Sequence, residues 1–146
     1  MLSSPAFTAY AVTTVALCFN LMVLWGWSGG TRVVSKTAIN PEDLSTVSKG
    51  AVRVTADPDS VARVIRAFNN AAANNIPFLL LASVYVQLGP NINLVYGLFA
   101  AFTAFRYLHS AVYLLELQPW RTLSFALGVV INGVMMVDAL RLIIMG

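Results

Sequence analysis

The sequence predicts an all-α integral membrane protein, folded as one four-helix bundle that takes up residues 1–146 as a single domain. Of these residues 58% are hydrophobic and only 10% are charged, whereas about a quarter of a soluble domain is charged. One bilayer crossing takes about 20 mostly apolar residues, so the chain has room for four spans with short loops. Breaks typical of loops separate the apolar segments, at "WSGG", "GPNIN" and "LQPW".

These breaks set the expected helix boundaries. The first helix is expected over residues 6–27, because the glycines of "WSGG" are poor helix formers. The second is expected over 58–88 and the third over 93–117, since the proline of "LQPW" disfavours helix at the residue before it. The fourth is expected over 122–145.

The segment "DPDSVARV" has the features of a helix start. Asp57 or Asp59 can cap the free backbone amides, and Pro58 suits the first turn. We therefore expect a capped second helix that begins in solvent and carries its polar residues in its first half.

The charge of the loops predicts the orientation in the membrane. The first loop, residues 29–60, contains four cations, Arg32, Lys36, Lys49 and Arg53, and the third loop adds Arg121. The N-terminal ten residues and "GPNIN" contain none. By the positive-inside rule, loops one and three are expected to be cytoplasmic and both termini to lie on the opposite side.

Polar residues recur at helical spacing on the second and third helices. The first set is Arg63, Arg66, Asn70 and Asn74, and the second is Arg106, His109 and Tyr113. Residues three and four apart share one helix face, and ionisable residues inside a membrane bundle tend to face its interior or a wet cavity. Together with Arg121 and Thr122, the two sets predict a polar cleft that opens toward the cytoplasm and binds an anion.

Structural roles compete with this interpretation at single positions. Asn69 and Asn75 could simply bond across helices, and Arg63 could extend to the lipid headgroups. His109 alone is more often a satisfied interior histidine than a catalyst, and Asp138 with Arg141 is most simply a structural pair. The sequence has no phosphate loop, nucleophile elbow or metal-spaced ligand cluster, so no metal is expected.

Several motifs occur in an order typical of one family. They are "NPED", "DPDSVARVIRAFNNAAANNIPFL", "LGPN", "FRYLHSAVYL" and "QPWRTLSF". In these motifs the chain resembles the membrane-associated proteins in eicosanoid and glutathione metabolism (MAPEG). Within this family, it is most similar to the branch of microsomal glutathione transferases and prostaglandin E synthases. The resemblance runs from the first loop into the fourth helix.

This resemblance implies a homotrimer that holds glutathione between adjacent subunits, near the cytoplasmic side, and takes a lipophilic substrate from the bilayer. It implies that Arg121 stabilises the glutathione thiolate and that Thr122 supplies a hydroxyl beside the sulfur. A cation and a donor next to a thiol lower its pKa from about 8.5. The implied glutathione contacts are Arg32, Arg66, Asn70, His109 and Tyr113.

The chain departs from the family pattern at several positions. An acid expected three residues after Asn70 is replaced by Ala73, and Phe68, Ala71 and Phe125 also differ from the family. Arg106 therefore lacks its expected acidic partner, and an unpaired buried cation is unfavourable. We expect Asn74, one position further on, to take over part of the role of the acid and to contact the ligand.

The function predicted from these features is a glutathione-dependent transferase or peroxidase that acts on a lipophilic electrophile or hydroperoxide in the membrane. The alternative is a non-catalytic MAPEG-like protein that binds a lipid or a partner, which the lost acid favours. A small multidrug transporter also has four short helices, but the first predicted span has no carboxylate to couple protons.

Overall fold

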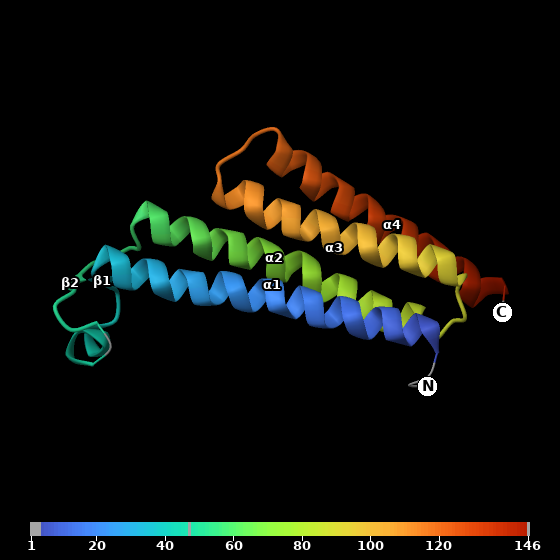
Figure 1. The fold of residues 1–146 in the computed structure, drawn as a ribbon, viewed down its shortest axis with the longest axis horizontal. Coiled ribbons are helices and arrows are strands. Elements are labelled where there is room, and N and C mark those ends of the chain that lie inside the picture. Colours follow the sequence, from blue (N-terminus) through green and yellow to red (C-terminus); the bar gives the residue numbers. More distant parts are fainter. Residues whose placement is uncertain (1–3, 47, 146) are drawn as a thin grey trace.

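The structure, a computed structural model, describes residues 4–46 and 48–145. Four helices run alongside one another: α1 (Pro5–Ser35), α2 (Asp59–Tyr85), α3 (Ile92–Leu114) and α4 (Trp120–Met145) (Figure 1). The α1–α2 and α3–α4 connections lie at one end of the bundle, which we call the loop end, and α1 begins and α4 ends at the other (Figure 1). The four predicted helices are confirmed.

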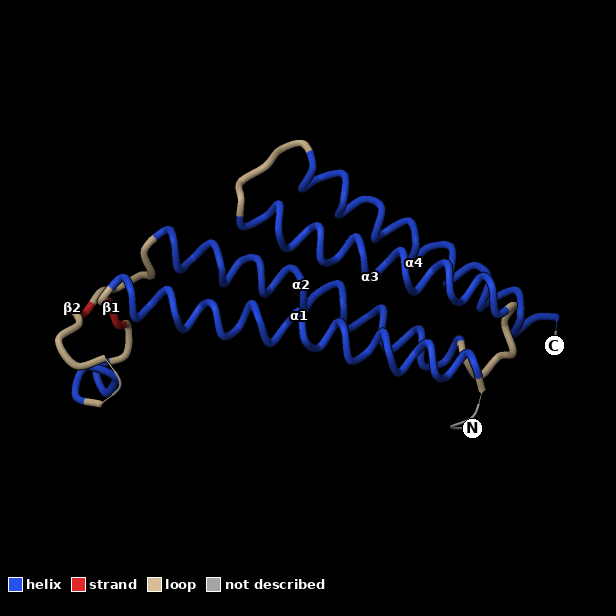
Figure 2. Tube along the Cα trace, in the orientation of Figure 1, coloured by secondary structure: helices blue, strands red, loops and turns tan. Residues whose placement is uncertain are grey.

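The connection between α1 and α2 has a small fold of its own (Figure 2). Strands β1 (Thr37–Ala38) and β2 (Val52–Arg53) pair in parallel, and a short 3₁₀ helix, η1 (Pro41–Ser45), lies between them in the chain. The α1–α2 hairpin extends farther at the loop end than the α3–α4 hairpin does (Figure 1). This difference in reach separates the cations of the first loop from those near the α3–α4 turn.

Helix α1 is longer than predicted, and the expected end at Trp27 is wrong. The helix continues through Gly29 and Gly30 to Ser35 and ends where Lys36 adopts a left-handed conformation with φ 50°. Each glycine disfavours helix by about 1 kcal/mol relative to alanine. Arg32 in the last turns of α1 pairs with Asp57 at 3.0 Å, and β1 follows at once, so the last turns are tied to the loop fold.

The start of α2 differs from the expected cap. The N-cap position is Pro58, and no side chain caps the helix, so the prediction of a cap from Asp57 or Asp59 is wrong. Asp57 instead accepts hydrogen bonds from Arg32, from Nε at 3.2 Å and from Nη2 at 3.0 Å. An ionised arginine is a stronger partner for a carboxylate than a backbone amide, which explains the exchange.

The main apolar core lies in the half of the bundle toward the termini. Phe78 stacks on Phe102 with ring centroids 3.8 Å apart and meets Phe99 edge-on at 5.5 Å. Leu17 of α1 and Met135 of α4 are fully buried in the same cluster, so all four helices contribute. At the loop end, a smaller cluster of Leu24, Ala67 and Ala71 joins α1 to α2, and several polar side chains line the space beside α3 and α4 there.

A polar contact fastens α2 to α4 near the termini. Tyr85, fully buried, donates a hydrogen bond of 2.7 Å from Oη to Asp138 Oδ2. Arg141 lies 2.8 Å from the other oxygen of Asp138, which confirms the predicted pair of Asp138 and Arg141. Tyr85 is a third member that the spacing on α4 could not reveal.

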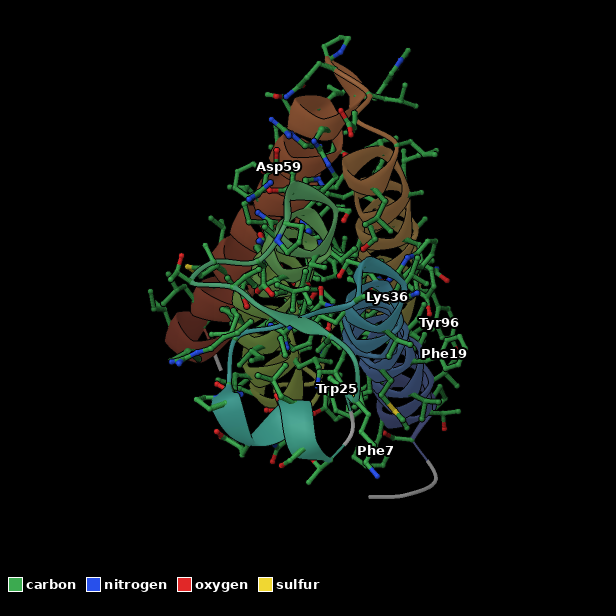
Figure 3. All side chains as sticks on the ribbon, turned by 90° about the vertical axis from the view of Figure 1, so that its left-hand side faces the viewer. Phe7, Phe19, Trp25, Lys36, Asp59 and Tyr96 are labelled. Carbon is green, nitrogen blue, oxygen red and sulfur yellow. The ribbon has the colours of Figure 1, made fainter. Side chains whose placement is uncertain are left out.

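In the part of the chain that the structure describes, α1 and α4 are long and apolar enough to cross a membrane. Their outer faces carry large exposed apolar side chains such as Trp25, and Figure 3 shows Phe19 of α1 at the outer edge of the bundle. The polar residues of α2 and α3 keep these two helices below the same hydropathy level. Membrane crossing by α2 and α3 therefore stays a prediction that rests on their packing beside α1 and α4.

Candidate functional site

A cavity of about 260 Å³ lies between α2, α3 and the first turns of α4, at the loop end. Its lining is Asn70, His109, Tyr113, Arg121, Thr122 and Phe125. The structure therefore brings together five of the eight predicted site residues, from three separate segments of the chain. Arg32, Arg66 and Asn74 lie outside this cavity.

Two groups hold the guanidinium of Arg121. Its Cζ lies 5.0 Å from the centroid of the Tyr113 ring, a cation–π geometry. The Gln118 amide, with its oxygen turned to the arginine, accepts from Nη2 at 2.7 Å and from Nε at 3.0 Å, and its nitrogen then donates to Thr122 Oγ1 at 3.1 Å. Gln118 was not predicted, although its position three residues before Arg121 in "QPWR" is a signal that sequence reasoning could have used.

His109 joins α3 to the first turn of α4. It is 3% exposed, and its Nδ1 lies 3.1 Å from the carbonyl oxygen of Arg121 and 3.2 Å from Ser124 Oγ. A carbonyl oxygen can only accept, so Nδ1 carries the proton in this contact. His109 Nε2 has no hydrogen-bond partner among the described residues. This histidine thus fixes the backbone that carries Arg121 and retains one unused nitrogen.

Arg106 is the largest fully buried side chain that the structure describes. Its Nη2 donates to Asn70 Oδ1 at 2.9 Å, and its Nε and Nη1 have no partner among the described residues. Asn74 donates instead to the carbonyl oxygen of Asn70, within its own helix, at 2.8 Å. Asn70, rather than the expected Asn74, is thus the residue that contacts Arg106, and Ala73 lies exposed on α2.

The remaining cations of the predicted site have other surroundings. Arg32 pairs with Asp57 and lines a separate pocket, and Arg66 is exposed on α2. Arg63, for which lipid headgroups were one interpretation, forms an ion pair of 3.0 Å with Glu116, at the turn after α3. Within one protomer, these arginines do not converge on the Arg121 cavity.

Among the described residues, Asn75 does not form the hydrogen bond to a neighbouring helix of its own protomer that was one interpretation of this residue. Its side chain is fully buried, and neither amide atom has a hydrogen-bond partner among the described residues. A bond from Asn75 to a neighbouring helix, which the sequence suggested, is not found in this part of the chain.

The cavity is suited to a small anionic group. Arg121 lines it, the buried guanidinium of Arg106 is bonded to its wall through Asn70, and no carboxylate is among the lining residues. A positive charge and a hydroxyl, that of Thr122, are adjacent there, and a negatively charged sulfur or oxygen would be stabilised by both.

Comparison with known proteins places these residues in a family context. The model of the MAPEG family matches residues 10–141. Human prostaglandin E synthase is 34% identical over 129 residues, which cover 88% of this chain and 84% of that protein. Rat microsomal glutathione S-transferase 1 is 34% identical over 141 residues, which cover 94% of this chain and 87% of that protein. Asn70, His109, Tyr113, Arg121, Thr122 and Phe125, the whole lining of the cavity, fall inside the matched segment.

Proposed function

The chain belongs to the MAPEG family, and from this premise we propose that it is a glutathione-dependent enzyme of the membrane. It transfers glutathione to a lipophilic electrophile or reduces a lipid hydroperoxide. In the transfer, the thiolate sulfur forms a bond to an electrophilic carbon while a leaving group departs. In the reduction, two glutathione molecules are oxidised to their disulfide, and the hydroperoxide yields an alcohol and water.

The observation that carries the proposal is the convergence of Arg121 and Thr122 on one cavity with Asn70, His109 and Tyr113. A free thiol with a pKa of about 8.5 is mostly protonated near neutrality. Arg121 favours the thiolate by its charge and Thr122 by a hydrogen bond, and both effects lower the pKa of the thiol. Gln118 and Tyr113 fix Arg121 before the ligand arrives.

The other residues of the cavity hold the tripeptide. Asn70 presents its amide at the wall, and Arg106 behind it keeps two nitrogens, Nε and Nη1, without a partner among the described residues. His109 offers its unused Nε2. These groups can satisfy the carboxylate, amide and amine groups of glutathione that would otherwise lose their hydrogen bonds to water.

Three copies of this one-domain chain form the complete site. The cavity of about 260 Å³ is smaller than the roughly 300–1,000 Å³ of most ligand pockets, so one protomer alone encloses too little space. Arg66 and Asn69 are exposed on α2, where contact with lipid would be unfavourable and contact with a neighbour would satisfy them. In the trimer Arg66 and Asn74 reach glutathione across the interface, and the lipophilic substrate enters from the bilayer.

The loop end faces the cytoplasm, where glutathione is abundant in its reduced form. The cations of the two loop-end connections support this orientation by the positive-inside rule. The termini of the bundle then lie on the opposite side of the membrane.

The test is a calorimetric titration of the detergent-solubilised protein with glutathione, combined with the ultraviolet absorbance of the thiolate. Wild type is expected to bind glutathione and to show the thiolate absorbance at a pH below the ordinary pKa of the thiol. Arg121→Ala is expected to lose this absorbance. Arg53→Ala, a cation of the same end outside the cavity, is the control and should change neither. The proposal is refuted if wild type does not bind glutathione and if Arg121→Ala gives the same titration and the same absorbance as wild type.

A second titration addresses the missing acid. Ala73→Glu places a carboxylate on the exposed face of α2, which belongs to the proposed interface. Because hydrogen bonds to charged groups contribute about 1.5–3 kcal/mol, glutathione binding is expected to become about tenfold tighter. Unchanged binding would show that this face of α2 does not reach the ligand.

A non-catalytic, lipid-binding member of the family is the second candidate. An apolar groove of about 580 Å³ between α1 and α3 favours it, because the groove is large enough for a lipid chain. Its lining includes Val12, Ala16, Tyr96 and Phe99, far along the bundle from Arg121. Copurified lipid in a protein without any thiol chemistry would support this candidate, and measurable turnover would exclude it.

A further inference from the structure

We propose that the α1–α2 connection binds the phosphate group of an anionic membrane lipid, in a pocket separate from the Arg121 cavity. The pocket has a volume of about 350 Å³, and its lining is Arg32, Val33, Lys36, Ser48, Lys49, Gly50 and Ala51. It shares no lining residue with the cavity of Arg121. The proposal does not depend on glutathione chemistry.

The loop fold brings two distant lysines to this pocket. Lys36 ends α1 in the left-handed conformation, and its carbonyl oxygen accepts a hydrogen bond of 2.9 Å from Val52 N. The pairing of β1 with β2 continues this contact, and Gly50 turns the chain just before it with φ 81°. As a result Lys49 lines the same pocket as Lys36, although it lies on the returning segment of the loop.

The pocket has an excess of positive charge. Arg32, Lys36 and Lys49 line it and no carboxylate does. Asp57 neutralises Arg32 at 3.0 Å, while neither lysine forms an ion pair in the part of the chain that the structure describes. The negative end of the α1 dipole accounts for cations on the last turn of α1 but not for Lys49, which comes from another segment. An anion between the lysines would offset their repulsion.

The tryptophans place the pocket at the depth of lipid headgroups. Trp25 and Trp27 near the end of α1 and Trp120 at the start of α4 are all exposed at the loop end, and they are the three tryptophans of the chain. Exposed tryptophans mark the edge of the hydrocarbon layer. Arg32 follows Trp27 by five residues, about 7 Å at 1.5 Å per residue, and the headgroup layer is roughly 5–8 Å thick.

The apolar rim distinguishes a lipid from a free phosphate. Val33 lines the pocket and is 71% exposed, and its neighbour Val34 is 84% exposed. A soluble phosphate makes no use of exposed valines, whereas the glycerol and upper acyl carbons of a lipid cover them. Basic pockets beside membrane helices are suited to anionic headgroups for this reason.

The test uses the full-length protein, stripped of lipid in neutral detergent and titrated calorimetrically with four probes. The probes are short-chain phosphatidylglycerol, short-chain phosphatidylcholine, inorganic phosphate and glutathione. The variants are Lys49→Gln and Lys36→Gln/Lys49→Gln, and Arg53→Gln is the matched control because it removes one cation of the same loop outside the pocket. Circular dichroism and gel filtration establish that every variant is folded.

Wild type is expected to bind phosphatidylglycerol more tightly than phosphatidylcholine. Lys49→Gln is expected to weaken the binding of phosphatidylglycerol about fivefold, and the double variant is expected to weaken it about thirtyfold, while Arg53→Gln has little effect. Equal losses in Lys49→Gln and Arg53→Gln would show diffuse surface attraction and overturn the proposal. It is also overturned if inorganic phosphate binds as tightly as the lipid, or if glutathione competes with the lipid for the pocket. A failure of glutathione to bind anywhere would contradict the proposed enzyme and leave the lipid result intact.

Discussion

The guanidinium of Arg121 lies over the ring of Tyr113, with its Cζ 5.0 Å from the ring centroid. The two residues come from different helices, so the contact connects the end of α3 to the first turn of α4. A planar guanidinium can stack on an aromatic face while the N–H groups at its edge donate further hydrogen bonds, which a lysine ammonium cannot do in the same way. The shape of this side chain therefore matters as well as its charge.

Two replacements of Arg121 are expected to distinguish the contribution of its charge to catalysis from that of its planar shape. Arg121→Ala should lower kcat about a hundredfold or more, as for the loss of one preorganised electrostatic group, and Arg121→Lys should lower it roughly tenfold. The measurement is turnover of glutathione with a chromogenic aryl halide, along with the pKa of the bound thiol from its absorbance. Equal rates in Arg121→Lys and wild type would mean that the contacts with Tyr113 and Gln118 are irrelevant.

Gln118 is expected to act as a positioning residue. Gln118→Leu removes the acceptor that lies 2.7 Å from Arg121 Nη2 and 3.0 Å from Nε, while the charge of Arg121 remains. We expect the pKa of bound glutathione to rise and kcat to fall about tenfold with little change in KM, since hydrogen bonds to charged groups contribute about 1.5–3 kcal/mol. Gln118→Glu should recover the low pKa only in part, because its own charge opposes the thiolate. A pH profile that does not move in Gln118→Leu would leave this residue with a structural role.

Asn70 and Asn74 provide a matched pair for the stability of the buried arginine. Asn70→Ala removes the one described partner of Arg106 and should lower the free energy of unfolding by about 1–3 kcal/mol. Asn74→Ala removes only a hydrogen bond within its own helix and should change the free energy of unfolding by less than about 0.5 kcal/mol. Asn70→Asp should restore stability, because a carboxylate compensates the buried charge. Thermal unfolding in detergent would measure all three, and equal effects of the two alanine variants would speak against this assignment.

The contact between Tyr85 and Asp138 is expected to stabilise the far end of the bundle. Tyr85→Phe keeps the buried ring and removes the 2.7 Å bond, so it should destabilise by about 1–2 kcal/mol. Arg141→Gln should have a smaller effect, about 0–1 kcal/mol, because that arginine side chain is 53% exposed. The same unfolding experiment compares the two losses of stability. A larger loss for Arg141→Gln than for Tyr85→Phe would contradict this prediction.

Composition and periodicity were sufficient for the four helices, because hydrophobic segments and proline or glycine breaks act locally. They failed at Gly29 and Gly30, where the loop fold and the pairing of Arg32 with Asp57 hold the end of α1 against the local preference. They also failed at Asp57, since a distant arginine is a better partner than the nearby backbone amides. Both errors arise where tertiary contacts outweigh a local preference.

The candidate site was predicted in part for a similar reason. Helical spacing places Arg106 and His109 on one face of α3, and the cavity does bring His109, Asn70 and Arg121 together. Spacing alone does not tell whether Asn70 or Asn74 meets Arg106, because the two are one turn apart on the same face. Nor does it show that Arg32 is already paired, since its partner lies 25 residues away.

The greater reach of the α1–α2 hairpin at the loop end gives the molecule an accessible handle (Figure 1). Glu42, on the exposed η1 segment, stands apart from the other hairpin, and Cys18 is the only cysteine in the chain. Glu42→Cys in a Cys18→Ser background thus carries one thiol, well away from the Arg121 cavity. In sealed vesicles, its labelling by an impermeant maleimide reports directly which compartment the hairpin enters.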